Sequence, residues 1–140
     1  MSGFLLDTDV LSELIKPKPD GSVLRWIDET DESILCLSVL TLGEIRNGIA
    51  RLGRGARRGR LESWLQVDLR TRFQGRVLPI DEAIVDRWGT ISATAAARGK
   101  PLPVVDGLIA ATALHHNLTL VTRDSSDVAG TGVATVNPWV

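Results

Sequence analysis

The segment PVVDGLIAATALHHNLTLVTRD, residues 103–124, decides the fold prediction. Its first half, Val105 to Leu114, is apolar almost all round, which indicates a buried helix, and Asn117 marks the end of that helix. Leu118–Thr122 is a short apolar run of the kind that forms a buried strand. A buried helix that leads directly into a buried strand is typical of parallel α/β sheets.

The rest of the chain repeats this alternation of apolar runs and amphipathic stretches. Further strands are predicted at Phe4–Leu6, Ile34–Leu37 and Val77–Ile80, with a weak last one at Gly132–Val136. Strands that alternate with helices favour a parallel sheet with helices on both faces. We therefore expect an α/β fold with a central, mainly parallel sheet of four to five strands, in a single domain over residues 1–140.

The overall composition is that of an ordinary globular protein, with 44% hydrophobic and 24% charged residues. A single cysteine, Cys36, excludes an internal disulfide framework and a cysteine-rich zinc site. The sequence has no run of about 18 apolar residues and no signal-peptide pattern at its N-terminus. We therefore expect a cytoplasmic protein that does not contact a membrane.

Charge is unevenly distributed along the chain. The net charge of −1 by itself argues against a nucleic-acid partner. Residues 46–76, however, hold nine arginines and two acids, a net charge of +7 that leaves −8 for the rest. The densest part, Arg51–Arg60, contains three glycines and is predicted as a loop or a frayed helix. It either binds phosphate groups or is only a solvated surface segment.

Four acids lie where strands end or helices begin. Asp7 follows the first strand, and Asp124 lies just beyond the Leu118–Thr122 strand. Glu44 lies in the first turns of the helix after the second strand, and Asp106 opens the buried helix. Ligands of such sheets bind at the carboxyl ends of the strands, so we expect the four carboxylates to converge at one edge.

Each of these acids also has a local alternative. Asp106 and Asp7 could each cap a helix by accepting hydrogen bonds from backbone N–H groups. Glu44 follows Thr41 at the spacing of a T-x-x-E capping box. Asp124 could be a simple turn residue. Four such coincidences are less likely together than singly, which favours a common site.

Carboxylates that are forced together repel one another and raise each other's pKa, and a divalent cation removes that repulsion. Ligands that are all oxygen suit Mg²⁺ or Mn²⁺, whereas zinc prefers nitrogen and sulfur. A metal of this kind lowers the pKa of a bound water and stabilises charge on a phosphate. Metal-assisted hydrolysis of a phosphodiester is therefore the chemistry that the four acids predict, and the arginines supply a surface for the phosphate backbone.

Four segments, taken in this order along nearly the whole chain, resemble the PIN-domain ribonucleases, specifically the VapC and FitB toxins of bacterial type II toxin–antitoxin systems. The most specific match surrounds the third acid. The matching segments are Phe4–Glu13, Ser38–Ile45, Pro103–Ala113 and Leu120–Asp124.

The resemblance implies a PIN-like fold and RNA cleavage that depends on Mg²⁺ or Mn²⁺, with the metal held by Asp7, Glu44, Asp106 and Asp124. Asp7 and Asp106 are expected to be direct ligands. Glu44 and Asp124 are expected to bind the metal through water, to bind a second metal or to orient the attacking water.

Two further residues enter through the same resemblance. Many relatives carry an acid a few residues after the Asp124 position, where this chain has Asp127. The fourth acid is therefore expected to be Asp124, Asp127 or both. Thr122 is expected to support a ligand or the phosphate by hydrogen bonding.

The partners that the resemblance implies are an RNA substrate, a second copy of the chain in a homodimer, and a cognate antitoxin of the VapB or FitA type. The antitoxin's C-terminal segment is expected in a groove beside the acids, where it often places an arginine. DNA is expected to be bound only indirectly, through the antitoxin.

Two other functions remain open at this stage. Leu5–Val10 also fits the opening motif of haloacid-dehalogenase phosphatases, in which Asp7 would be a covalent nucleophile and Asp9 a general acid. The chain has no convincing downstream lysine and acidic pair for that family. The second alternative is a PIN-like binding module that does not turn over a substrate.

Overall fold

The computed structural model describes residues 3–140 and contains one five-stranded sheet in the order β3-β2-β1-β4-β5. Every neighbouring pair of strands is parallel. The predicted α/β fold with a mainly parallel sheet is confirmed. The strands are β1 (Phe4–Leu6), β2 (Leu35–Ser38), β3 (Val77–Leu78), β4 (Thr119–Val121) and β5 (Thr135–Val136).

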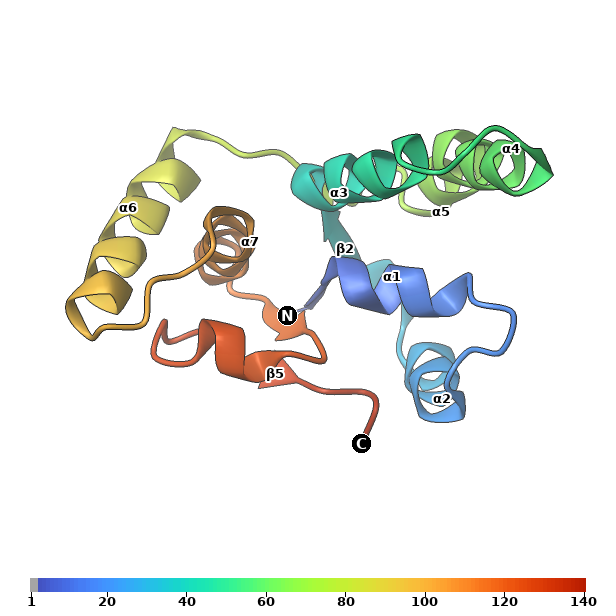
Figure 1. The fold of residues 1–140 in the computed structure, drawn as a ribbon. Coiled ribbons are helices and arrows are strands. Elements are labelled where there is room, and N and C mark those ends of the chain that lie inside the picture. Colours follow the sequence, from blue (N-terminus) through green and yellow to red (C-terminus); the bar gives the residue numbers. More distant parts are fainter. Residues whose placement is uncertain (1–2) are drawn as a thin grey trace.

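Helices cover both faces of the sheet, as predicted (Figure 1). On one side lie α1, α2, α3 and the helical run that contains α4 and α5, and on the other lie α6 and α7. Their bounds are Thr8–Leu14 for α1, Gly21–Glu29 for α2, Val39–Ala50 for α3, Ala56–Ser63 for α4, Arg70–Arg72 for α5, Glu82–Ala97 for α6 and Val104–His115 for α7. Short 3-10 turns cover Glu32–Ile34 and Ser125–Val128, and a π-helical stretch, Trp64–Leu69, joins α4 to α5.

Adjacent residues of β1 enter two different cores, because side chains alternate between the faces of a strand. Leu6 packs with Leu11 and Phe73 under the helices of one face, and Leu5 packs with Ile109 and Ala113 of α7 on the other. Leu5 and Leu6 are both fully buried. This two-sided burial explains why the strand is continuously apolar in the sequence.

The strands lie where the sequence predicted them, but their ends differ by a few residues. β3 is an edge strand and is shorter than the predicted Val77–Ile80, because it ends at Leu78, directly before Pro79, which has no N–H to donate. Gly99 and Asn117 end α6 and α7 with positive φ angles of 75° and 55°. The arginine segment differs from the loop or frayed helix that we expected, because α4 begins at Ala56 and includes Gly59. The helical residues that follow Gly59, such as Leu61 and Leu65, pack against the core, and the helix continues through the glycine.

No helix within residues 3–140 has both the length and the hydropathy needed to cross a membrane.

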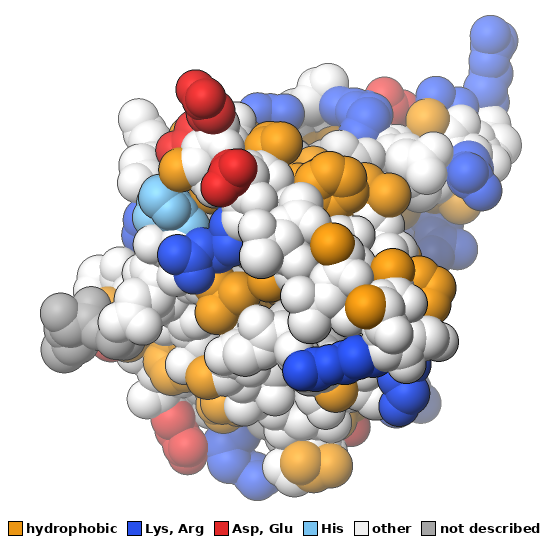
Figure 2. Space-filling model, turned by 90° about the vertical axis from the view of Figure 1, so that its left-hand side faces the viewer, with side chains coloured by type: hydrophobic (Ala, Val, Ile, Leu, Met, Phe, Trp, Pro, Cys, Tyr) orange, Lys and Arg blue, Asp and Glu red, His pale blue; other side chains and the backbone are white. Residues whose placement is uncertain are grey.

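The face that α6 presents to solvent carries charged side chains of both signs among scattered apolar ones (Figure 2).

The order of the strands determines where a ligand can bind. The chain passes from β1 to β2 on one side and later returns to place β4 on the other side of β1. The carboxyl ends of β1 and β4 therefore flank the point at which the direction of the strand order reverses, which is the usual ligand site of such sheets.

Candidate metal site at the edge of the sheet

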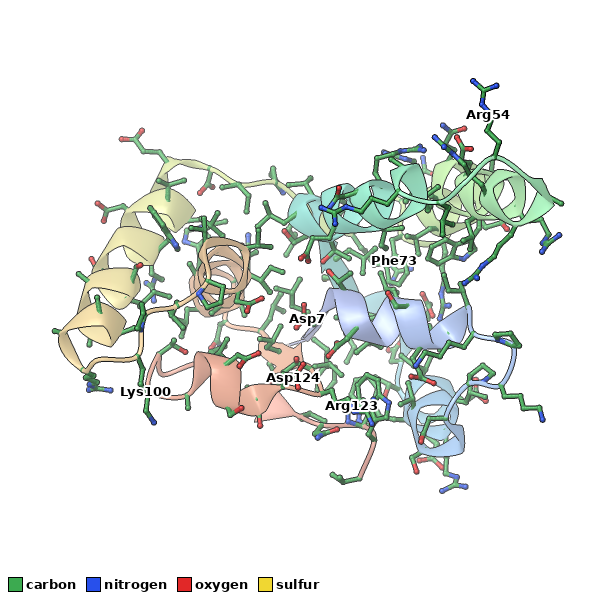
Figure 3. All side chains as sticks on the ribbon, viewed as in Figure 1. Asp7, Arg54, Phe73, Lys100, Arg123 and Asp124 are labelled. Atoms are coloured by element: carbon green, nitrogen blue, oxygen red, sulfur yellow. The ribbon has the colours of Figure 1, made fainter. Side chains whose placement is uncertain are left out.

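A cavity of about 240 Å³ opens at the carboxyl ends of β1 and β4. The structure brings to it all four predicted acids, Asp127, which was expected with or in place of Asp124, and also Asp9. The carboxylates that line the cavity are Asp7, Asp9, Glu44, Asp106, Asp124 and Asp127. In Figure 3, Asp7 and Asp124 lie close to each other at the centre of the molecule.

Asp7 is positioned by its place directly after β1. Its backbone N–H donates to the carbonyl of Val121 in β4 at 2.9 Å, which continues the ladder between the two strands. Its Oδ2 accepts a hydrogen bond from the hydroxyl of Thr122 at 2.9 Å, and its Oδ1 accepts one from the N–H of Thr8 at 2.8 Å. Asp7 therefore caps α1 and also lines the cavity, so the local alternative and the site role are both compatible with its position.

Glu44 reaches the cavity from α3. The hydroxyl of Thr8 donates to its Oε1 at 2.5 Å, which links the first turn of α1 to the middle of α3. The capping box that we considered for Glu44 and Thr41 is wrong, because α3 begins three residues earlier than that motif requires. Its N-cap is Ser38, whose Oγ accepts from the N–H of Leu40 at 3.1 Å.

Asp106 lies in the first turn of α7 and is not a helix cap, because the N-cap position belongs to Pro103. The local alternative for Asp106 is therefore wrong. Burial raises the pKa of its carboxyl above the ordinary value, and the charges of Asp7, Asp127, Glu44 and Asp124 raise it further. Asp106, which apolar residues flank in the sequence, thus lies where a negative charge is costly.

Asp124 and Asp127 both line the cavity, so the structure does not require a choice between them. Asp124 follows β4, and its N–H donates to the hydroxyl of Thr122 at 3.2 Å. Asp127 lies one turn further on, in the 3-10 turn Ser125–Val128, where its N–H donates to the carbonyl of Asp124 at 3.0 Å.

Asp9 enters the cavity from the first turn of α1. Its Oδ2 accepts from the backbone N–H of Arg123 at 3.0 Å and lies 3.5 Å from the hydroxyl of Thr122. Its Oδ1 is buried and has no hydrogen-bond partner among the described residues. Burial, followed by the charge of Asp7, raises the pKa of Asp9 to about 6.

The cavity has a strongly negative electrostatic character. No lysine, arginine or histidine from residues 3–140 lines it. Burial is also the main reason that the pKa of Asp7 is raised, and the charges of Asp124 and Asp127 add to this effect. A cation would remove this repulsion, and it would also provide the partner that the buried Asp9 Oδ1 lacks.

Comparisons with known proteins identify the family of this chain. A family model described as PIN domain matches residues 4–128. The chain belongs to the PIN-domain family. Toxin FitB of Neisseria gonorrhoeae is 38% identical over 135 residues, which is 96% of this chain and 97% of FitB. VapC ribonuclease Y4jK of Sinorhizobium fredii is 39% identical over 96% of each chain. The predicted resemblance to VapC- and FitB-like toxins is thereby confirmed.

Solved structures show the same likeness. The structure of FitAB bound to an IR36 DNA fragment contains a chain that is 36% identical to this PIN domain, with a TM-score of 0.93 over 98% of this chain and 96% of the other. A structure of FitAcB from Neisseria gonorrhoeae gives 38% identity and a TM-score of 0.92.

The residues of this PIN domain fit a hydrated magnesium or manganese ion. All six carboxylates of the cavity would bind a metal through oxygen atoms, which are the ligand atoms that Mg²⁺ and Mn²⁺ prefer. Within the described part of the chain, no three His, Cys, Asp or Glu side chains lie close enough to surround one ion by themselves. Magnesium usually binds one or two carboxylates and keeps several waters, so the wider spacing suits an ion that other carboxylates reach through water.

Two residues of this PIN domain's cavity, Thr8 and Asp9, were not predicted as site residues from the sequence. We considered Asp9 only for the phosphatase alternative, and we gave Thr8 no role. Their position in the sequence could have predicted both. Residues in the first turn of a helix that directly follows a strand lie at the same edge of the sheet as the strand's last residue. The hydrogen bonds from Thr8 to Glu44 and from Arg123 to Asp9 join positions 36 and 114 residues apart, which local patterns do not reveal.

Proposed function

We propose that this PIN domain is the ribonuclease toxin of a type II toxin–antitoxin system and hydrolyses RNA phosphodiester bonds with the help of Mg²⁺ or Mn²⁺. The observation that carries the proposal is the cavity itself, in which six carboxylates gather at the sheet edge without a basic side chain from residues 3–140. Two relatives that match nearly the whole chain support it, one named a toxin and the other a VapC ribonuclease.

Asp7 and Asp106 are proposed to hold the metal directly, and Glu44 and Asp124 to hold it through water or to orient the attacking water. The bound ion would lower the pKa of a water molecule and offset charge on the scissile phosphate. Thr122 donates to Oδ2 of Asp7 and thereby holds this carboxylate in its orientation at the cavity. Thr8 similarly holds Oε1 of Glu44, which leaves Oε2 to accept a hydrogen bond from water.

The partners are part of the same proposal. We propose a homodimer that is inhibited by a cognate antitoxin of the VapB or FitA type, with DNA bound only through the antitoxin. The similar FitAB structure was solved with a DNA fragment, and a similar VapBC structure from Salmonella typhimurium is also DNA-bound. The second of these is only 23% identical, so it supports the fold alone.

The arginines of the predicted RNA-binding segment differ in whether their guanidinium groups are engaged within the protein. Arg58 is engaged within the protein, because its guanidinium lies 3.2 Å from Glu62 and donates to the carbonyl of Leu52 at 3.1 Å. Arg54 is exposed and points into solvent at the end of the molecule furthest from α6 (Figure 3). Arg57 and Arg60 are also exposed, and neither forms an ion pair within residues 3–140. Arg54, Arg57 and Arg60 of this segment are therefore accessible to a phosphate, whereas Arg58 is engaged within the protein.

Two of these arginines line a second hollow. It has a volume of about 740 Å³ and is lined by Arg57 and Arg60 of α4 together with Lys16 and Ile15. It adjoins the C-terminal end of α1, whose first turn lies in the acidic cavity. Since α1 has seven residues and is about 10 Å long, we propose that an RNA strand bound at the acids runs along α1 to this hollow.

We predict that the triple variant Arg54→Ala, Arg57→Ala, Arg60→Ala binds single-stranded RNA more weakly and with a flatter salt dependence. Loss of three phosphate contacts should reduce the slope of log K against log salt by about 2. The measurement is RNA affinity across a salt series. The double variant Arg25→Ala, Arg87→Ala is the control, because both arginines are exposed and lie in other helices. An unchanged slope in the triple variant would reject this role.

The proposed function is tested with the purified chain freed of any antitoxin. We expect it to cut single-stranded RNA when Mg²⁺ or Mn²⁺ is present and to leave the phosphomonoester p-nitrophenyl phosphate intact. Hydrolysis of the phosphomonoester through a phosphorylated Asp7, without RNA cleavage, would establish the phosphatase alternative instead. RNA binding without cleavage under any divalent cation would establish the binding module.

A further inference from the structure

The peptide bond that joins Arg123 to Asp124 is held at both of its polar atoms. The N–H of Asp124 donates to the hydroxyl of Thr122 at 3.2 Å. The carbonyl of Arg123 accepts from the side-chain amide of Asn137 at 3.3 Å. The N–H of Arg123 donates to Asp9 in the cavity, so the backbone here is fixed from the cavity side and from the C-terminal side.

The segment from Asn137 to Trp139 forms the outer support of this peptide. It follows β5, which pairs with β4, and the N–H of Thr122 donates to the carbonyl of Val136 at 2.9 Å. The Oδ1 of Asn137 accepts from the backbone N–H of Trp139 at 2.9 Å, which orients the amide so that its nitrogen faces Arg123.

Trp139 connects this support to α1. Its indole Nε1 donates to Oε1 of Glu13 at 3.4 Å. Glu13 is a buried carboxylate that also accepts from Lys16 at 2.8 Å and from the N–H of Asp20 at 2.9 Å, so its position is fixed. The C-terminal segment therefore joins the loop that carries Asp124 to the helix that begins beside Asp7.

The same tryptophan determines where the side chain of Arg123 lies. The guanidinium stacks over the indole ring with its carbon 5.3 Å from the ring centroid, and Arg123 does not line the acidic cavity. Arg123 nevertheless lies close to the cavity, because it precedes Asp124 in the chain and its backbone N–H forms a hydrogen bond with Asp9. Without the ring, nothing in the described contacts would keep this positive charge from turning toward the carboxylates.

We propose that Asn137 and Trp139 are positioning residues of the acidic site: Asn137 holds the Arg123–Asp124 peptide, and Trp139 keeps the Arg123 charge away from the metal-binding carboxylates. This inference rests on the proposed function only where it concerns the metal. The hydrogen bonds of the peptide exist whether or not the chain cleaves RNA.

The test uses Asn137→Ala, Trp139→Ala and Trp139→Phe in the full chain, with Val140→Ser as the control because Val140 is 97% exposed. Calorimetry measures Mn²⁺ affinity, and NMR measures hydrogen exchange at the Asp124 amide without metal. We expect Asn137→Ala and Trp139→Ala to weaken Mn²⁺ binding about tenfold, the lower end of the cost of losing a residue that orients a metal ligand. Asn137→Ala should also accelerate exchange at Asp124, and Trp139→Phe should retain most of the Mn²⁺ affinity because it keeps an aromatic face.

A second variant separates positioning from general destabilisation. Adding Arg123→Gln to Trp139→Ala should restore much of the Mn²⁺ affinity while leaving the melting temperature of the single variant unchanged. The inference is overturned if Asn137→Ala alters neither Mn²⁺ affinity nor exchange at Asp124, or if Arg123→Gln restores nothing. Failure of the wild type to bind Mn²⁺ would instead overturn the proposed metal site, and the exchange measurement would still decide the role of Asn137.

Discussion

Replacing Asp106 with asparagine should reduce metal-dependent RNA cleavage by about 10³-fold, the upper range for removing one electrostatic group from an active site. The substitution keeps the shape of the side chain but removes the negative charge of a proposed direct ligand. The protein should still fold, because burial and neighbouring carboxylates make that charge costly in the absence of metal. The measurements are cleavage of a single-stranded RNA with Mn²⁺ and thermal unfolding with the metal chelated.

Asp86→Asn is the matched control, since Asp86 is an exposed aspartate on α6, the helix that packs against α7. It should leave cleavage and stability unchanged. Full RNase activity of the purified Asp106→Asn variant would contradict the assignment of Asp106 as a ligand. An unfolded variant would indicate that the carboxylate has a structural role that the geometry does not reveal, and Asp7→Asn would then take its place in the assay.

Removal of divalent cations should have an effect of similar size on cleavage and a pH-dependent effect on stability. The pKa values of Asp7, Asp9 and Asp106 are all raised in the folded protein, that of Asp9 from 3.8 to about 6. Groups of this kind contribute most to stability below about pH 4, and the contribution is lost as the pH rises through the folded pKa values. The metal-free protein should therefore lose stability as the pH rises from about 4 through the pKa of about 6 of Asp9, and the raised pKa values of Asp7 and Asp106 act in the same direction.

A bound cation offsets this loss, and protons compete with it at low pH. At a Mn²⁺ concentration 100 times the dissociation constant, binding adds about 2.7 kcal/mol, which corresponds to roughly 8 °C in melting temperature for a chain of this size. We expect that shift at pH 7.5 and a much smaller one at pH 5, measured by thermal unfolding with NaCl of equal ionic strength as the control. A shift that is equal at both pH values, or that NaCl reproduces, would show that the cation does not bind these carboxyls.

Much of the fold was predictable because local pattern and topology agree. The apolar run before Asp7 and the all-round apolar helix after Asp106 are signals of burial on both faces of a parallel sheet. The convergence of the predicted acids follows from the same reasoning, since parallel strands end at one edge. Asp106 was the clearest single signal, because a carboxylate flanked by apolar residues needs a compensating partner.

The details that were not predictable depend on contacts between distant positions. The spacing of Thr41 and Glu44 matches a capping box, but the helix starts at Ser38, and Glu44 is instead bound by Thr8. The C-terminal support was also invisible, because Trp139 and Glu13 are 126 residues apart. The net charge of the segment does not distinguish Arg57 from Arg58, although of the two only Arg58 forms an ion pair with Glu62.

Anomalous diffraction from crystals grown with Mn²⁺ tests directly whether the acidic cavity is a metal site. We predict an anomalous peak in the cavity, with carboxylate oxygens of Asp7 and Asp106 about 2.0–2.2 Å from the ion, the distance usual for small octahedral divalent cations. A well-ordered cavity without a peak at a Mn²⁺ concentration that supports RNA cleavage, or Mn²⁺ bound only elsewhere on the protein, would rule out a metal site in the cavity.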